Sequence, residues 1–138
     1  MLDSSTIDYL KRGRSTAAVC YAQALYHKQE IESCFSNFLD DWDIVLAPAT
    51  ACTAFPCGWP PATIDGQPVD PDWKGFAPFN VYGNLTRAPV AVVPAGQSQD
   101  KLPVGVLVFS KYGRDDLVLQ VCKVVEDAQP WLREPQAS

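Results

Sequence analysis

Apolar side chains recur at helical spacing in two long stretches of the chain. In residues 15–39 and 115–127 they return every three or four positions, which predicts two amphipathic helices. Residues 6–11 predict a shorter helix, with Gly13 expected to end it. Ser15 is expected to cap the long helix that follows. The chain therefore contributes helices near both of its ends.

Three unbroken apolar runs predict strands between these helices. They lie at residues 44–47, 90–93 and 104–109, and none shows the alternation of a strand with one exposed face. Such runs are typical of strands covered on both faces. A polar turn at residues 97–101 joins the second and third runs, which predicts a hairpin. Helices and strands together indicate an α/β fold, with helices packed on part of a mixed β-sheet.

Residues 49–89 predict a long proline- and aromatic-rich loop. Seven prolines lie from Pro48 to Pro78, with Trp and Phe side chains interleaved, and proline both interrupts helices and lacks the donor for a strand ladder. Loops of this length usually cover a functional site, although an extended segment that only wraps the domain is equally compatible. A proline-rich peptide ligand in residues 56–78 is a weaker interpretation, because the aromatic side chains favour packing against the domain.

These elements are too few for a closed domain. Three strands buried on both faces need cover on two sides and partners at both edges. We therefore interpret residues 1–138 as a single partial domain. Its sheet would be completed by upstream sequence, by a partner chain, or by a second copy in a homo-oligomer.

Composition and charge narrow the class of protein. The chain is 47% hydrophobic and 20% charged, as expected of a folded domain, and its net charge of −5 argues against binding to nucleic acid. No apolar run approaches the roughly 20 residues that span a bilayer, and no signal pattern opens the chain. We expect a cytoplasmic protein without membrane contact.

The inventory of reactive side chains is sparse. Five cysteines show no metal-site spacing, and His27 is the single histidine, so neither a metal nor another cofactor is expected. A nucleophilic Cys52 or Cys57 would need a nearby base. His27 lies in the predicted long helix, off its apolar stripe, and is therefore a poor candidate for that base or for a Ser–His–Asp triad.

Four segments resemble the C-terminal part of the amidase-signature family, among them residues 72–80 (DWKGFAPFN). Residues 42–50 (WDIVLAPAT) resemble its Tyr-Asp-hydrophobic-Pro-Thr element. Residues 84–96 (NLTRAPVAVVPAG) resemble its Asn-Leu-Thr-Gly-x-Pro-Ala and Val-Pro-x-Gly stretches, and residues 102–106 (LPVGV) its Leu-Pro-Val-Gly strand. The resemblance implies helices around a large mixed sheet, and hydrolysis of amide bonds by two serines and a lysine. The chain would then be an incomplete amidase-signature-type domain.

The resemblance transfers no catalytic residue to this chain. Its single serine pair, Ser4-Ser5, lacks flanking glycines, and Lys11, Lys28 and Lys74 do not stand in the family's lysine context. The expected contribution is the sheet and a wall of the substrate pocket. The structural residues would be Asn84, Pro89, Pro94, Gly96 and Gly105.

The resemblance also suggests pocket residues and two departures from the family. The loop after Pro48, with Thr50, Cys52 and Phe55, resembles a region that lines the family's substrate cleft. Asn80 stands where many members have threonine, and these four residues are the pocket candidates. Arg87 stands where the family usually has glycine, which matters if the backbone there needs a positive φ.

Two functions remain open. The chain would be the C-terminal portion of an amide-bond hydrolase that acts on a small amide once an N-terminal amidase half is supplied. Alternatively it is a non-catalytic binding or scaffold relic of that fold, which pairs with another chain.

Overall fold

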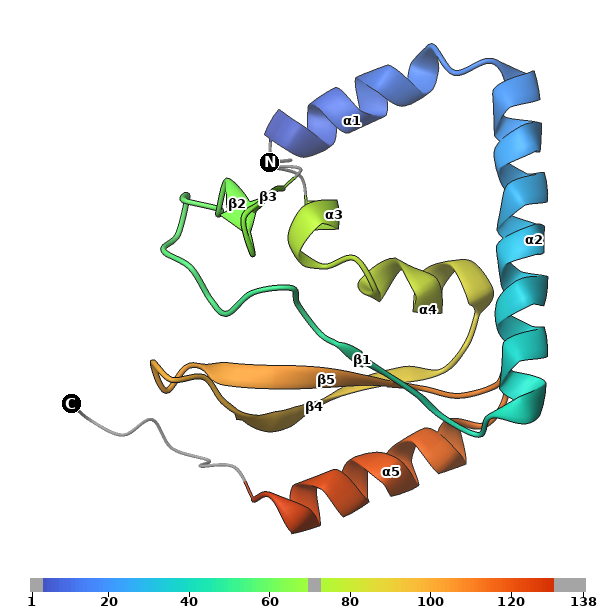
Figure 1. Ribbon diagram of the computed structural model, residues 1–138. Coiled ribbons are helices and arrows are strands. Elements are labelled where there is room, and N and C mark those ends of the chain that lie inside the picture. The colour runs from blue at the N-terminus through green and yellow to red at the C-terminus, as the bar shows by residue number, and fades with distance from the viewer. Residues whose placement is uncertain (1–3, 70–72, 131–138) are drawn as a thin grey trace.

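A small antiparallel sheet lies between helices in the computed structural model, which describes residues 4–69 and 73–130 (Figure 1). One helix, α5, runs along one face of the sheet, whereas α4 and the C-terminal part of α2 lie on the other side. The elements in chain order are α1 (Ser4–Arg14), α2 (Ala18–Asp41), β1 (Val45–Pro48), β2 (Thr63–Ile64), β3 (Gln67–Pro68), α3 (Trp73–Phe76), α4 (Asn80–Thr86), β4 (Val90–Gln97), β5 (Pro103–Phe109) and α5 (Asp115–Ala128).

The main sheet has the strand order β1-β5-β4, so the last strand is central. Both pairings are antiparallel, and Phe109 is opposite Val45 on one side and Val90 on the other. The predicted hairpin is confirmed, with a β-bulge between Pro94 and Gly96. The α/β fold class is confirmed, and within the described residues every strand pair is antiparallel.

Alternate residues of β5 build the two halves of the core. Leu107 and Phe109 point to the side of α2, where Phe35 packs against them. Val108 points to the opposite side and joins Val93 and Val118 of α5. The central strand is therefore buried on both faces, as its apolar run predicts, and the side chain of Val108 is fully buried.

The prediction of two covered faces is wrong for the two outer strands. Leu46 of β1 is 59% exposed and Val92 of β4 is 62% exposed. Leu46 is opposite Val108 and so lies on the face of α5, but that helix runs along β4 and β5. Val92 is opposite Leu107 and lies on the other face, where the helices cover β1 and β5 instead. Each outer strand is thus bare on one face at one residue, Leu46 or Val92, whereas Val90 at the start of β4 lies against Gly83 of α4.

The helices form where predicted, but their ends differ in detail. The first helix continues through Gly13 to Arg14, so this glycine does not end it. Ser15 does not cap α2, whose N-cap is Ala17 without a side-chain hydrogen bond. The Ser15 hydroxyl instead donates to the Arg12 carbonyl at 2.9 Å. It thereby provides a hydrogen-bond donor to a carbonyl at the C-terminal end of the preceding helix.

Residues 49–89 contain more regular structure than a loop. A two-stranded hairpin, β2–β3, and the helices α3 and α4 lie within them. The prolines permit α4 because they flank it: Pro78 precedes the helix and Pro89 follows it. The sequence prediction failed here because it weighed proline density over proline position.

Candidate functional site

The predicted pocket segment after β1 lies beside the end of α3. The backbone amide of Ala51 donates to the Phe76 carbonyl at 2.8 Å. The ring of Phe55 meets that of Phe76 edge-on, with centroids 5.4 Å apart. The segment of three predicted pocket residues, 50–55, therefore lies beside Phe76, four residues before the fourth candidate, Asn80.

The four pocket candidates differ in what they offer. Thr50 is exposed, and its hydroxyl donates to the Cys52 carbonyl at 2.7 Å, which holds the turn after β1. Cys52 and Phe55 are half-buried. Asn80 is the first residue of α4 and its side chain is exposed. Within residues 4–69 and 73–130, no hydrogen bond links it to the other three candidates. Their role as a pocket wall stays a prediction.

An apolar hollow of about 310 Å³ lies next to this segment. Three of its rings pack on one another: Phe35 stacks on Tyr82 at 6.2 Å, and Tyr82 stacks on Phe79 at 6.5 Å. Sequence reasoning missed it, although Phe79 and Tyr82 stand three positions apart, the spacing of one helix face. The residues that line it are Phe35, Val45, Leu46, Ala47, Pro48, Phe79, Tyr82 and Phe109.

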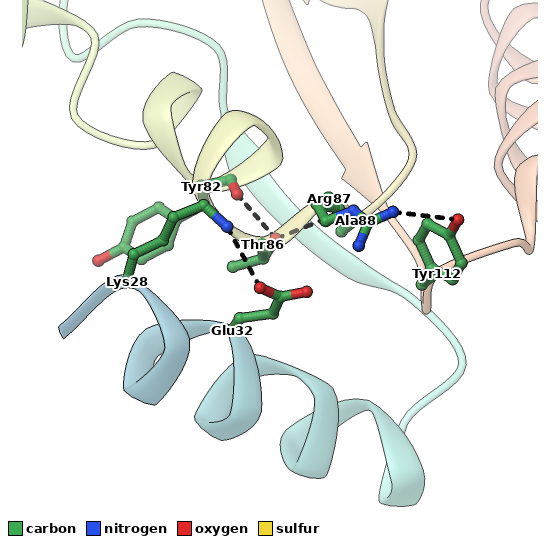
Figure 2. Close-up of polar contacts among 7 residues, drawn as sticks. All are labelled: Lys28, Glu32, Tyr82, Thr86, Arg87, Ala88 and Tyr112. Carbon is green, nitrogen blue, oxygen red and sulfur yellow. Dashed lines mark hydrogen bonds and ion pairs between the residues drawn. The ribbon is translucent and has the colours of Figure 1, made fainter. Parts of the chain in front are cut away.

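The turn from α4 into β4 is held by a chain of short-range contacts (Figure 2). The Thr86 hydroxyl donates to the Tyr82 carbonyl at 2.7 Å and accepts the Ala88 amide at 3.4 Å. Arg87 ends α4 with φ +60°, in the left-handed region. Its guanidinium lies over the Tyr112 ring, 5.0 Å from the centroid. Arg87, which stands where the resemblance implies a glycine, therefore has a backbone conformation in which glycine is the least strained residue.

Four of the five predicted structural residues lie in the β4–β5 hairpin or directly before it, and Asn84 lies on α4. The Pro89 carbonyl accepts the Ser110 amide at 3.3 Å and so closes the start of β4 on β5. Pro94 and Gly96 form the bulge, and Gly96 has φ +143°. Gly105 is hemmed in, since a Cβ there would lie 3.1 Å from Val92 Cγ2 and 3.2 Å from Ala49 Cβ. Asn84 is exposed on α4.

Six pairs of a basic and an acidic side chain lie at the surface in the described part of the chain. The His27 ring pairs with Glu30 at 2.9 Å on an exposed part of α2. The Arg114 guanidinium donates two hydrogen bonds to Asp116 and lowers the pKa of that carboxyl. Burial raises the pKa of the Cys122 thiol, which makes it a weaker nucleophile at neutral pH.

Residues 4–69 and 73–130 bring together no group of three histidine, cysteine or acidic side chains able to hold a metal ion. No helix within those ranges, the 24-residue α2 included, has the length and apolarity to cross a bilayer.

Replacing Arg87 separates the backbone strain from the side-chain contact. Arg87→Ala keeps the positive φ and loses the Tyr112 contact, whereas Arg87→Gly loses the contact but relieves the strain. We expect the glycine variant to be about 1 kcal/mol more stable than the alanine variant. Urea unfolding measures the difference, and equal stability of the two variants would show that the turn relaxes around any side chain.

Several proteins of one family are similar to this chain over most of its length. The family model Amidase matches residues 6–119. An acylamidase of Rhodococcus erythropolis is 26% identical over 134 residues, which cover 94% of this chain and 27% of that protein. A 6-aminohexanoate-cyclic-dimer hydrolase of a Pseudomonas species is 47% identical over 60 residues, which cover 43% of this chain and 11% of that protein.

Solved structures agree on the fold. A bacterial aryl acylamidase of the amidase-signature family superposes with a TM-score of 0.79 at 24% identity, over 94% of this chain and 27% of that one. A 6-aminohexanoate cyclic dimer hydrolase in complex with substrate gives a TM-score of 0.80 at 24% identity, over 98% of this chain and 30% of the other. The chain thus spans less than a third of the length of each of these relatives. With the family model matching most of its residues, the chain belongs to the amidase family.

Proposed function

We propose that this chain is the C-terminal portion of an amide-bond hydrolase, and that it contributes sheet and pocket wall without the catalytic serines and lysine. The observation that carries the proposal is its coverage: 94% of the chain matches an acylamidase, yet that match takes in 27% of the acylamidase. The nucleophile would lie in a region that corresponds to the unmatched part of the acylamidase. This chain would then work by positioning and enclosing a substrate that another segment attacks.

Exposed apolar surface supports the proposal that another part of an amidase packs against this chain. The chain exposes 10801 Å², whereas a compact monomer of 15.1 kDa exposes about 7100 Å². Large apolar side chains stand in solvent along α1 and the first half of α2, an amount unusual for a monomer. These exposed side chains are Ile7, Tyr9, Leu10, Val19, Tyr21, Leu25 and Tyr26.

The substrate would be a small amide with an apolar part. Support comes from the hollow beside residues 50–55, whose lining includes the aromatic rings Phe35, Phe79, Tyr82 and Phe109. The names of two relatives, an acylamidase and a cyclic-dimer hydrolase, both denote amide substrates. The protein would be located in the cytoplasm. Support comes from its five cysteines, which form no disulfide, as is usual in that reducing compartment.

A covalent probe for activated serines tests where the nucleophile resides. The sample is this chain mixed with an N-terminal amidase portion, and a fluorophosphonate reagent is added. We expect labelling of the N-terminal portion and none of this chain, because the proposal assigns it no activated serine. A parallel sample contains the acylamidase of Rhodococcus erythropolis cut before its matched region, to show that a two-piece enzyme is labelled at all.

Two results would count against the proposal. Label on a serine of this chain would give it a catalytic role. No labelling in the mixture, when the two-piece acylamidase is labelled, would favour a scaffold relic that only binds another chain.

A further inference from the structure

We propose that Asp65, in the turn of the β2–β3 hairpin, rearranges spontaneously to isoaspartate through a cyclic imide that it forms with the backbone nitrogen of Gly66. In isoaspartate the main chain runs through the side-chain carbons of the residue, and repair methyltransferases recognise this form. The chemistry concerns residues 62–69 alone and is independent of the proposed function. Three features favour it: an unhindered carboxyl group, a free amide next to it, and a hairpin that opens easily.

Asp65 and Gly66 form the two-residue loop of the hairpin. Ile64 and Gln67 pair with each other on either side of the loop. Both loop residues have positive φ, +50° at Asp65 and +73° at Gly66, as in a type I′ turn. In such a turn the hydrogen bonds belong to the flanking pair, so the amide of the second loop residue is left to solvent. The Gly66 nitrogen is therefore not held by the ladder.

Both groups that must meet in the ring closure are accessible. Asp65 and Gly66 are exposed, and no atom lies within 4 Å of a Cβ built on Gly66. Glycine itself has no side chain that would hinder the approach of its nitrogen to the Asp65 carboxyl carbon. The surroundings of the turn thus place no obstacle in the path of the reaction.

The hairpin is small enough to open locally. β2 and β3 have two residues each, and one further bond, from the Val69 amide to the Ala62 carbonyl at 3.0 Å, extends their pairing. The hairpin lies away from the three-stranded sheet (Figure 1), and neither of its strands packs extensively on another helix or strand of the described chain. An isolated hairpin of this length is only marginally stable, so the loop can reach the ring-closing conformation.

The rearrangement needs no reagent except water. The Gly66 nitrogen attacks the carboxyl carbon of Asp65, a C–N bond forms, and the carboxyl hydroxyl leaves as water together with the amide proton. Water then adds to one of the two carbonyl carbons of the imide. Addition at the side-chain carbonyl restores aspartate, whereas addition at the main-chain carbonyl breaks its bond to the Gly66 nitrogen and gives isoaspartate. The product keeps its carboxylate but has a longer main chain, which no longer fits a two-residue type I′ loop.

Asp100 is a matched comparison within the same chain, because it also stands in an exposed turn. The residue that follows it, Lys101, carries a side chain, and the Lys101 amide donates to the Ser98 carbonyl at 2.9 Å. This nitrogen must lose its hydrogen bond before it can attack a carboxyl carbon. The two exposed aspartates therefore differ in the freedom of the amide that follows each of them.

Incubation of the purified chain in neutral buffer for several weeks tests the proposal. An isoaspartyl methyltransferase with methyl-labelled S-adenosylmethionine measures the isoaspartate formed, and electron-transfer fragmentation of peptides locates it. We expect isoaspartate to accumulate at Asp65 at least about tenfold faster than at Asp100, because the Lys101 amide is bonded and hindered. Asp65→Glu should abolish the signal, since glutamate closes the corresponding larger ring far more slowly. Asp100→Glu should leave the signal unchanged.

Lys101→Gly separates the effect of the turn geometry from that of an Asp-Gly pair as such. The variant has a second exposed Asp-Gly pair, yet the amide after Asp100 still meets the Ser98 carbonyl. We expect Asp100 in this variant to rearrange at least about fivefold more slowly than Asp65. A peptide of residues 60–69 gives the rate of an open chain, and the folded chain should stay within about tenfold of that rate.

Two results would overturn the proposal. A folded chain in which Asp65 stays intact while the peptide rearranges would mean that the hairpin holds the turn closed. Equal rates at Asp65 and at Asp100 in the Lys101→Gly variant would remove the role assigned to the free Gly66 amide. Circular dichroism of each variant before incubation verifies that the compared chains are folded.

Discussion

Phe109→Ala is expected to lower the free energy of unfolding by about 3–5 kcal/mol, because it empties the centre of one core half. The Phe109 side chain is 2% exposed and lies on the central strand. Its ring meets Phe35 of α2 at 5.9 Å, and Ala47 and Leu107 pack around it. Since a domain of this size has roughly 5–15 kcal/mol of stability in total, the variant should lose a large share of it.

Phe38→Ala is the matched control for this substitution. Phe38 is on α2 and is 52% exposed, and its ring is stacked on that of Trp42 at the surface. We expect a loss of at most about 1 kcal/mol. Urea unfolding followed by circular dichroism compares the two variants. Equal losses would mean that the core does not centre on Phe109.

Gly105→Val is expected to destabilise the chain by about 2–3 kcal/mol through overpacking. A Cβ at this position would lie 3.1 Å from Val92 Cγ2 and 3.2 Å from Ala49 Cβ, closer than ordinary contacts. Val92 belongs to β4 and Ala49 directly follows β1, so valine would push both outer strands away from β5. The glycine of the Leu-Pro-Val-Gly stretch thus allows three strands to pack closely.

Gly13→Val is the control, because a side chain there meets open space. No atom lies within 4 Å of a Cβ built on Gly13, which is inside α1. Valine and glycine differ little in helix propensity, so the change in stability should stay within about 0.5 kcal/mol. If Gly105→Val were equally mild, the strand spacing around Gly105 would have to be more open than described.

The order of helices and strands could be predicted because it depends on local patterns. Apolar periodicity placed α2 and α5, an unbroken apolar run placed β5, and the polar turn placed the hairpin. Which strand faces are covered was not predictable from those patterns. Leu46 and Val92 look like core residues in sequence, yet both are bare because the helices cover different parts of the sheet.

The candidate site divides in a similar way. The resemblance singled out Arg87, and the structure gives that residue the positive φ at which glycine is favoured. The apolar hollow was out of reach, because its lining comes from α2, β1, α4 and β5, which the sequence keeps far apart. The pocket roles of Thr50, Cys52, Phe55 and Asn80 remain predictions.

Amide hydrolysis by a chimera, in which this chain replaces the matched C-terminal region of the Rhodococcus erythropolis acylamidase, is the most direct test of whether this chain is the C-terminal portion of an amidase. The measurement is release of an aryl amine from an anilide by this chain alone, by the N-terminal region of the Rhodococcus erythropolis acylamidase alone, and by the chimera of the two. We expect no hydrolysis above background from either piece and turnover by the chimera that is lost when the catalytic serine of the N-terminal region is replaced. Hydrolysis by this chain alone, or a folded chimera that does not turn over, would contradict the assignment.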